Sequence, residues 1–514
     1  MPSIEELNRA WLQDGASTST DGSRSPSSPS SGGVAIIGMG CRLPGSATDP
    51  SAFWDMLLAK ETAAGNIPLN RFDVDKFLHP QRGRPGSMTT AGGYLLRDDP
   101  TLFEPQLFSM KPTESAEIDP ALKKLLEVVY ETIESAGISM EKLAGSDTGC
   151  YIGSFNHDEL FSKAINTGEI ESAIVASSNL IWSPDMQMFL DKLGALSSTS
   201  QCHVFGSDAD GYGRGDGFVG FYLKDLNSAI RDNDNIQAVI RGTAANANGR
   251  TGGITHPSPT AQEAAMRKAY QMAGNLNPRD TAYYECHGTG TAVGDPIELK
   301  AIQSFFSARD KENPLLLGSV KANIGHGEPV SGLSGLLKVV LAIQRGVIPP
   351  MITPASINPL LNLDISRFQL VHEQAAWPAN LPRRASVATS GFGGANAHVV
   401  VEEFVSNGRQ AEVDRNIRPS RFLLPFSAHK PHSLVQNCGA LAAACDQDSY
   451  SPIDVAYTLG RRSRLPYRGF AVVSANPDTS LSLSSDQLQI AKRLRTTPPR
   501  IGFIFTGILL LSPS

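Results

Sequence analysis

Apolar residues along most of the chain follow either short unbroken runs or a helical spacing. The run VAIIGMG, which begins at Val34, predicts a short buried strand that ends in a tight glycine turn. After Asp119 and Pro120, which signal a helix start, apolar residues recur at helical spacing until Gly137 ends the pattern. We therefore expect a helix whose core side is formed by Leu122, Leu125, Leu126, Val129 and Ile133.

Later segments repeat this alternation of strands and helices. The segment from Ser331 to Gly346 is apolar on nearly every face, and it predicts a central helix in which Gly332 and Gly335 allow close backbone packing. Such alternation is typical of a layered α/β architecture with buried sheets. Further strands are predicted to start at Thr148, Ala173, Gly217 and Ala238.

Composition divides the chain into parts. Residues 1–33 end in a stretch of mostly Ser, Thr, Gly and Pro, which predicts a disordered leader because it contains too little apolar surface to fold. Residues 34–404 form the large α/β part, and the polar residues 405–420 lack apolar periodicity and predict a linker. Residues 421–500 predict a second, smaller α+β unit, and residues 501–514 begin like another buried strand and stop.

Charge and cysteine content exclude several classes. The 514 residues have a formal net charge of −6, which argues against nucleic-acid binding. The first residues lack a basic start and an apolar run, and the apolar run near the other end is shorter than the ~20 residues of a membrane span. Six cysteines without a CxxC pair form no disulfide framework or metal site. We expect a cytoplasmic protein without membrane attachment.

Two glycine-rich segments are similar to ligand-binding loops but lack residues that such loops need. In VAIIGMGCRLPG, Leu43 stands in place of the third glycine of a dinucleotide loop, and Pro44 follows it. In SDADGYGRGDG, which begins at Ser207, the third acidic ligand and the final Glu of a calcium loop are absent. We expect plain turns in both segments.

Two other segments place a histidine on a bend. In ECHGTGTAVGDPIE, His287 follows a strand-like run, where acid–base groups tend to lie, although a loop histidine can also be merely hydrogen-bonded. In SVKANIGHGEPVSG, Lys321, His326 and Glu328 precede the apolar helix. Burial there favours a neutral imidazole, which can donate a hydrogen bond to an oxyanion. The structural alternative, an ion pair between Lys321 and Glu328, is compatible with that role.

The segment SGFGGANAHVVVE, from Ser390, predicts a strand, a sharp glycine turn and a second strand. Backbone N–H groups at such a turn can bind an oxyanion, although glycine turns are common. Together and in this order, the glycine, histidine and strand–turn–strand segments resemble the β-ketoacyl synthase (ketosynthase) region of fungal type I iterative polyketide synthases, over residues 34–404. Residues 421–500 resemble the linker domain that follows it, and residues 501–514 resemble the start of an acyltransferase domain.

The resemblance implies a thiolase-like layered fold of two similar α/β halves, and a decarboxylative Claisen condensation of acyl and malonyl thioesters. It implies that His287 and His326 stabilise the enolate oxygen, that Lys321 and Glu328 support them, and that the backbone of Phe392 helps to bind the thioester oxygen. It implies no cofactor in this chain, because the phosphopantetheine is on a partner acyl carrier protein. It further implies a homodimer.

One residue that the resemblance requires is missing. The family carries its nucleophilic cysteine in a segment like D-T-A-C-S-S-S at a helix N-terminus, and this chain has no such segment. Cys286 adjoins His287, but neighbours in an extended segment point to opposite sides, and Cys150 is expected to be a buried strand residue. None of the cysteines precedes a serine run: Cys41, Cys150, Cys202, Cys286, Cys438 and Cys445.

The missing residue has a predicted place. The strands that start at Thr148 and Ala173 are separated by far fewer residues than the family has there, so we expect an internal deletion near residues 161–164 and an incomplete first half. Smaller departures are DPALK from Asp119, and Gly206 where the family usually has Asp. Without a thiolate no covalent acyl intermediate forms, although the decarboxylation step depends on the histidines.

Three functions therefore remain open. The first is a condensing acyltransferase that acts only if the missing segment is restored. The second is a truncated, catalytically inactive remnant that pairs with a full-length synthase. The third, a different enzyme class such as a serine hydrolase, has little support because the chain contains no G-x-S-x-G elbow. Covalent labelling of a cysteine by an acyl thioester would distinguish the first from the second.

Overall fold

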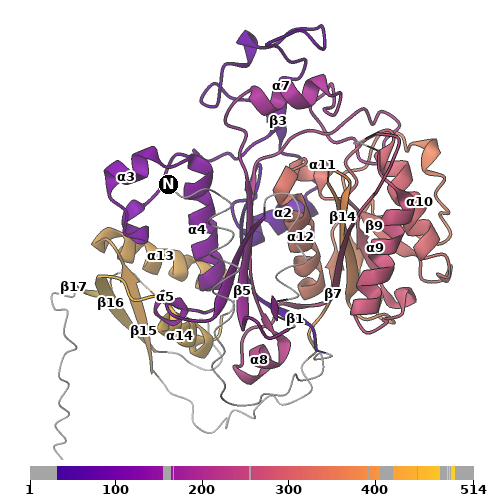
Figure 1. Cartoon of the computed structure of the whole chain (residues 1–514). Coiled ribbons are helices and arrows are strands. Elements are labelled where there is room, and N and C mark those ends of the chain that lie inside the picture. The colour runs from indigo at the N-terminus through magenta and orange to yellow at the C-terminus, as the bar shows by residue number, and fades with distance from the viewer. Residues whose placement is uncertain are drawn as a thin grey trace, which may run out of the picture. The chain divides into compact units, whose positions relative to one another are not determined.

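The computed structural model describes residues 32–153, 164–165, 167–253, 256–391, 393–405, 421–447, 450–474, 483, 486 and 488–492. In these residues ten strands form one mixed sheet, in the order β11-β9-β8-β13-β14-β7-β1-β6-β5-β4. Figure 1 shows the layers from left to right as α4, the strands around β5, α12, the strands around β7 and β14, and finally α9 with α10. The expected layered α/β fold is confirmed. The expected leader, the linker and residues 501–514 fall almost entirely outside the described residues.

Two stretches of the chain build matching halves of the sheet. In the first half, β1 pairs antiparallel with β6, β6 pairs antiparallel with β5, and β5 pairs parallel with β4. In the second half, β7 pairs antiparallel with β14, β14 pairs antiparallel with β13, and β13 pairs parallel with β8. Strands β1 and β7 join the halves by antiparallel pairing. The first half contains β1 (Val34–Arg42), α4 (Pro120–Ser135), β4 (Thr148–Gly153), β5 (Ser172–Asn179) and β6 (Gly217–Asp225). The second contains β7 (Ala238–Ala247), α9 (Pro259–Met272), β8 (Tyr283–Glu285), β13 (Arg384–Ser390) and β14 (Ala395–Glu402).

One difference between the halves lies between their second and third strands. Between β8 and β13 the second half inserts a helix, a strand that pairs parallel with β8, and two more helices: α10 (Gly294–Phe305), β9 (Leu315–Gly318), α11 (Lys321–Ile324) and α12 (Ser331–Arg345). At the matching place in the first half, only residues 154–171 join β4 to β5, and in the described residues β4 pairs with β5 alone. Most of the expected deletion point, residues 161–163, lies outside the described residues.

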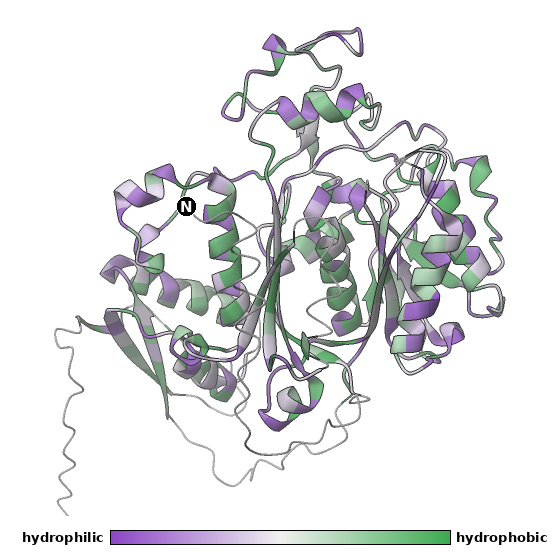
Figure 2. Ribbon diagram, viewed as in Figure 1, coloured by the Kyte–Doolittle hydropathy of each residue, from purple (hydrophilic) through white to green (hydrophobic). Residues whose placement is uncertain are grey.

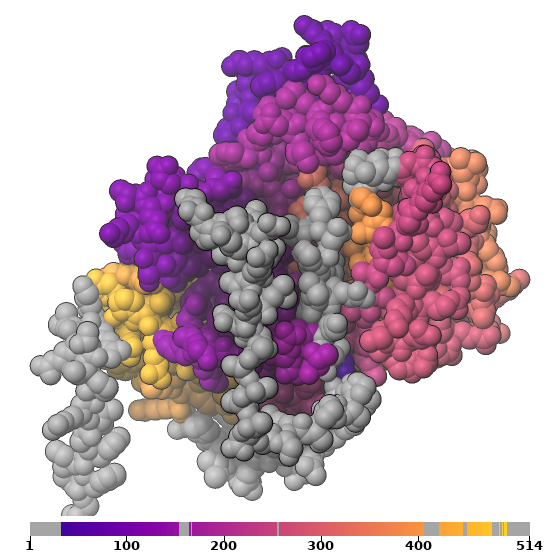
Figure 3. Space-filling model, viewed as in Figure 1, coloured from indigo at the N-terminus to yellow at the C-terminus, as the bar shows by residue number. Residues whose placement is uncertain are grey.

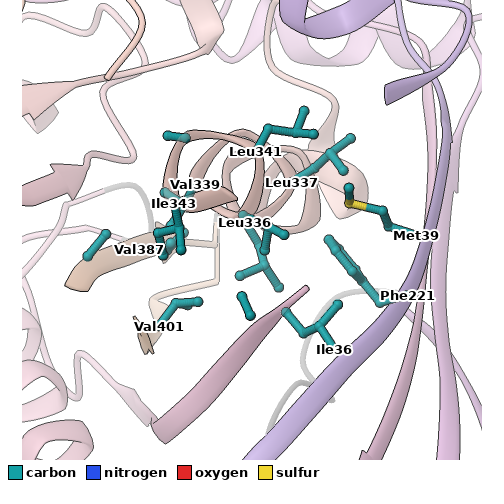
Figure 4. Packing of buried hydrophobic residues seen from close by; sticks show 14 of the residues in the cluster. Ile36, Met39, Phe221, Leu336, Leu337, Val339, Leu341, Ile343, Val387 and Val401 are labelled. Atoms are coloured by element: carbon teal, nitrogen blue, oxygen red, sulfur yellow. The ribbon is translucent and has the colours of Figure 1, made fainter. Parts of the chain in front are cut away.

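Helix α12 lies between the two halves and is buried along most of its length, as its sequence predicts. In Figure 2 its ribbon is largely green, the colour of hydrophobic residues. At Gly335 a Cβ would lie 3.2 Å from the Cγ of Glu285, which is why glycine is needed there. Gly346 adopts a left-handed conformation with φ 63° and ends the helix. Figure 4 shows the surrounding core, formed with Ile36, Met39, Phe221, Val387 and Val401.

The predicted helix after Asp119 is confirmed as α4, but the prediction for Leu122 is wrong. Leu122 is 47% exposed, whereas Leu125 and Ile133 are buried. The contact face runs through Val128 and Thr132 instead, because glycines in β1 and β6 bring the sheet up to these residues. Leu122 lies about a quarter turn away from that face, at about 100° per residue.

The smaller unit is an α+β unit, as expected. Its antiparallel sheet consists of β15 (Arg421–Ala428), β16 (Tyr467–Ser474) and β17 (Gln489–Lys492), packed with α13 (Pro431–Gln447) and α14 (Pro452–Arg461). Figure 3 shows this yellow unit beside the purple segment that contains α3. Ion pairs from Lys430 to Glu104 and from Arg462 to Glu134 join the two.

The other elements are short or surround the sheet. They are α2 (Pro50–Leu58), β2 (Ala64–Asn66), β3 (Gly92–Tyr94), α3 (Pro112–Glu117), α5 (Met140–Leu143), α7 (Asp185–Lys192), α8 (Leu226–Arg231), β10 (Val347–Ile348), β11 (Phe368–Leu370) and β12 (Ala375–Ala376). Strand β11 extends the second half by pairing parallel with β9. Five single-turn 3₁₀ helices complete the described elements: Val74–Lys76, Pro105–Phe108, Pro278–Asp280, Glu328–Val330 and Pro359–Leu361.

Candidate active site

Two histidine rings from separate segments meet at one point of the fold. His287 follows β8, and His326 lies between α11 and α12. Their ring centroids are 5.2 Å apart, with the rings edge to face. Both residues are partly buried. The structure thus brings together the two imidazoles that the sequence singled out.

Backbone contacts hold His326 and determine its tautomer. Its N–H donates to the carbonyl of Gly213 at 2.8 Å, and its carbonyl accepts from the N–H of Gly215 at 2.9 Å. Its ring Nδ1 accepts a hydrogen bond of 2.9 Å from the backbone N–H of Glu328. An amide N–H can only donate, so in the neutral ring Nδ1 has no proton and Nε2 carries it. Glu328 adopts an unusual positive φ of 50° to make this contact.

His287 is held in a similar way. Its Nδ1 lies 3.5 Å from the hydroxyl Oγ1 of Thr389, the residue before the predicted glycine turn. The carboxylate of Glu298 accepts the backbone N–H groups of His287 and Gly288 at 2.6 and 2.8 Å. When the Thr389 hydroxyl donates to Nδ1, the proton of the neutral His287 ring also lies on Nε2.

The surroundings keep both rings neutral. Burial lowers the pKa of His287 well below its usual value, and burial lowers the pKa of His326 to about 3. The ammonium of Lys321, which is only 2% exposed, lowers both pKa values further. The expected neutral imidazole beside the apolar helix is therefore supported, and each ring retains an Nε2–H donor. Whether Lys321 supports catalysis, as the resemblance implies, stays a prediction.

The expected ion pair between Lys321 and Glu328 is wrong. Glu328 pairs with Arg214 instead: Nε donates to Oε1 at 2.6 Å and Nη2 donates to Oε2 at 3.2 Å. Both side chains are nearly buried, at 3% and 9% exposure. The segment around Arg214 pairs with the segment around His326. Burial lowers the pKa of Lys321 overall, and the nearby charges of Glu285 and Glu298 oppose this effect. Sequence reasoning missed Arg214, although it lies in the ADGYGRGDGF segment.

Two buried acids shape the loop after His287. Asp295 accepts the N–H groups of Phe205 and Gly290 at 2.9 and 3.2 Å, and Glu298 binds His287 as described. Both acids lie in the first turns of α10, where the helix dipole favours negative charge. Burial raises the pKa of Asp295 to about 6 and that of Glu298 to about 7. Sequence reasoning missed them, and the signal was the GDPIE end of the His287 segment.

The described residues include all six cysteines, and no thiol forms a hydrogen bond with either histidine ring. Cys202 accepts a hydrogen bond from the Gly213 N–H instead, and burial raises its pKa to about 12. Burial raises the pKa of Cys286 well above its usual value, so burial favours the protonated form of both thiols. The expectation that Cys150 is buried is wrong: it is exposed, because β4 ends the sheet.

The remaining predicted donor, Phe392, lies outside the described residues. The glycine turn around it is present: Gly391 donates to the carbonyl of Ala395 at 2.7 Å, and Gly394 has a φ of 86°. In the described part of the chain no cluster of three or more His, Cys, Asp or Glu side chains is arranged to hold a metal ion. Among the same residues, every helix is too short or too polar to cross a membrane.

Comparison with protein families matches three consecutive stretches of the chain. The N-terminal domain of β-ketoacyl synthases matches in two overlapping segments, residues 32–162 and 155–229. The C-terminal domain of β-ketoacyl synthases matches residues 237–354, and the ketoacyl-synthetase C-terminal extension matches residues 358–472. The first match covers the first half of the sheet, the second match covers the second half as far as α12 and β10, and strands β11, β13 and β14 fall in the third match.

Curated relatives include fungal polyketide synthases. The highly reducing polyketide synthase rstn3 of Aspergillus nomiae is 40% identical over 544 aligned positions, and srdA of Neurospora crassa is 40% identical over 540. Each alignment covers 92% of this chain but 22% of the relative, so the chain spans about a fifth of their length. The alignments have more positions than the 514 residues of this chain, so the relatives contain residues that it lacks.

Solved ketosynthase structures share the fold. The oxazolomycin ketosynthase domain of Streptomyces albus superimposes with a TM-score of 0.81 at 27% identity, covering 91% of both chains. The ketosynthase from module 6 of the bacillaene synthase of Bacillus subtilis gives a TM-score of 0.78 at 28% identity, covering 90% of this chain and 87% of that one. The thiolase-like fold expected from the sequence is confirmed by these likenesses.

Proposed function

We propose that the histidine pair of this chain decarboxylates a malonyl thioester. The chain belongs to the β-ketoacyl synthase family and corresponds to the ketosynthase region of polyketide synthases. The observation that supports this most is that the two imidazole rings lie 5.2 Å apart, with Nδ1 of His326 accepting a hydrogen bond and Nδ1 of His287 beside the Thr389 hydroxyl. Burial lowers the pKa of both rings, which favours their neutral forms. Such a pair offers two hydrogen-bond donors to one developing oxyanion.

The reaction needs only those two donors. The bond between the carboxylate carbon and the α-carbon of the malonyl group breaks, carbon dioxide leaves, and the electron pair forms an enolate. The Nε2–H groups of His287 and His326 stabilise the enolate oxygen, and a proton from water then gives an acetyl thioester. Lys321 assists because its buried positive charge lowers the pKa of both rings and so keeps them in the neutral form.

Condensation requires, in addition, a thiolate that holds the growing acyl chain. We propose that the segment with this thiolate is the helix–strand–helix unit that the first half lacks between β4 and β5, and that condensation returns when the unit is restored. Support comes from the mismatch between the two halves, from the split match of the N-terminal family domain, and from alignments longer than the chain. The competing proposal is an inactive remnant that binds a full-length synthase.

The proposed partner is an acyl carrier protein whose phosphopantetheine presents the malonyl thioester, and the proposed assembly is a homodimer. The support is the similarity to polyketide synthases, of which the chain spans 22%. Light scattering of the purified chain tests the dimer. Co-purification with a malonyl-loaded carrier domain tests the partner.

A decarboxylation assay tests the proposed activity directly. The purified chain is mixed with malonyl-pantetheine labelled in the free carboxylate, and the released carbon dioxide is counted. We expect release that the variants His287→Ala and His326→Ala abolish, while His372→Ala, an exposed histidine bonded to Thr353, serves as the matched control and keeps the activity. Release at the uncatalysed rate would refute the proposal and favour the inactive remnant.

An acylation assay tests the missing nucleophile. The chain is incubated with a radioactive acyl thioester, and we expect no label on any cysteine. A second protein has the corresponding segment of rstn3 inserted between Gly153 and Ala164, and we expect this protein to become labelled and to condense. Label on the unmodified chain would contradict the absence of the thiolate, and an unlabelled but folded insertion protein would contradict the proposed location.

A further inference from the structure

A small pocket adjoins the residues that hold the backbone and ring of His287. Its volume of about 10 Å³, measured as the space open to the centre of a water-sized sphere, is enough for one water molecule. Its walls come from α9, β8, α10, β13 and β14, and include Gln262, Tyr284, Glu298, Thr389 and His398. Two of these, Glu298 and Thr389, are the residues that bond His287.

Three side chains that line the cavity each have one polar atom without a partner in the part of the chain that the structure describes. These atoms are Oε1 of Gln262, the hydroxyl of Tyr284 and Nδ1 of His398. All three residues are more than nine-tenths buried, with exposures of 8%, 0% and 1%. Buried polar groups are nearly always hydrogen-bonded, so three unpaired atoms around one cavity indicate a bound polar molecule.

The other ends of these side chains are anchored. The amide nitrogen of Gln262 donates to Oγ of Ser390 at 3.3 Å, and Nε2 of His398 lies 3.2 Å from Oγ of Ser386. These bonds orient the unpaired atoms. Burial also lowers the pKa of His398 to about 3, so the ring is neutral and one of its nitrogens accepts.

We propose that this cavity binds one buried water molecule. The water donates to Oε1 of Gln262 and to Nδ1 of His398, and it accepts a hydrogen bond from the hydroxyl of Tyr284. His398 then donates from Nε2 to Ser386. All three atoms then gain a partner.

The water lies beside Glu298 and Thr389, the residues that bond His287. It joins α9, β8 and β14 through three side chains at the level where Thr389 reaches His287. Gln262, Tyr284 and His398 line this pocket together with Thr389 and Glu298, the two residues that bond His287. This inference concerns hydration and does not rest on the decarboxylation proposal.

The direction in which Tyr284→Phe changes the midpoint of urea unfolding tests whether the water is bound. Tyr284→Phe in the full chain removes the hydroxyl, and the midpoint of urea unfolding is measured. If the water is present, a hydrogen bond is lost and the midpoint falls. The matched control is Tyr270→Phe, whose hydroxyl bonds Thr281 and Ser386 at 2.5 and 2.9 Å and whose midpoint must also fall. An unchanged or raised midpoint for Tyr284→Phe would overturn the proposal, because removal of an unpaired buried hydroxyl is neutral or stabilising.

Crystallography provides a second measurement that does not depend on a variant. Diffraction good enough to show ordered solvent should reveal density within hydrogen-bond distance of Gln262 Oε1, Tyr284 OH and His398 Nδ1. An empty cavity in such a map would refute the inference even if Tyr284→Phe fails to fold. Neither experiment uses substrate, so failure here leaves the proposed function untouched.

Discussion

Replacement of Glu328 by Gln is the sharpest test of how this site is held together. Gln keeps the size of the side chain and one oxygen acceptor but removes the negative charge that faces Arg214. The guanidinium is only 3% exposed, and its other side-chain partner is Gln187 Oε1 at 3.3 Å. The variant therefore leaves a buried positive charge without a counter-charge.

The expected cost follows from that burial. Loss of one partner of a buried ion pair typically destabilises a protein by about 3–5 kcal/mol, because the remaining charge is neither paired nor hydrated. The loss at an exposed pair is about 0–1 kcal/mol. Arg462→Met, at the more exposed pair with Glu134, is the matched control for the lower range. The two variants should therefore differ by several kcal/mol in the free energy of unfolding.

Urea unfolding at neutral pH measures both values. A double variant, Glu328→Met with Arg214→Met, should recover much of the loss, because it removes the unpaired charge as well. The malonyl decarboxylation rate should fall in Glu328→Gln too, because the weakened pair with Arg214 no longer fixes the segment whose backbone N–H bonds Nδ1 of His326. A cost for Glu328→Gln as small as that of Arg462→Met, or a double variant worse than the sum of its singles, would refute the buried-pair reasoning.

Three further predictions use other contacts. Thr389→Val should lower the decarboxylation rate by up to about tenfold, because one neutral hydrogen bond contributes about 0.5–1.5 kcal/mol. An unchanged rate would contradict a role for the Thr389 hydroxyl in holding His287. Burial raises the pKa of Glu298 from 4.5 to about 7, so the folded chain binds a proton that the unfolded chain releases. The contribution of Glu298 to the free energy of unfolding should therefore fall as pH rises from 6 to 8. Urea unfolding measures it as the difference between the chain and Glu298→Gln at each pH, because the buried histidines, whose lowered pKa values act in the opposite direction, are common to both proteins. Iodoacetamide should label the exposed Cys150 before the buried Cys202, and mass spectrometry showing the reverse order would contradict the described burial.

Much of the fold and part of the site could be predicted from residues alone. The apolar run from Ser331 and its glycines indicated the central helix, because a helix buried on all sides needs apolar residues all around it. The segments around His287 and His326 indicated both imidazoles, because such residues stand on bends after strands and before a buried helix. The assignment of catalytic roles to these histidines, and the absence of a nucleophile, stay predictions until the assays above are done.

Other features depended on contacts between distant segments. Glu328 pairs with Arg214 and not with Lys321, and only the folded chain shows that Arg214 lies beside Glu328. The exposure of Leu122 and Cys150 follows from how α4 is rotated and from where the sheet ends, which local spacing does not determine.

The sequence by itself determined the kind of fold, the two imidazoles and the absence of a serine-flanked cysteine, because these depend on residue type and local order. The tertiary structure decided which charges pair, which tautomers the rings adopt and which polar atoms share a cavity. Those outcomes depend on distances of a few ångströms between segments more than a hundred residues apart, such as Arg214 and Glu328 or His287 and Thr389. Local pattern contains no information about such distances, because they are set by packing of the whole core.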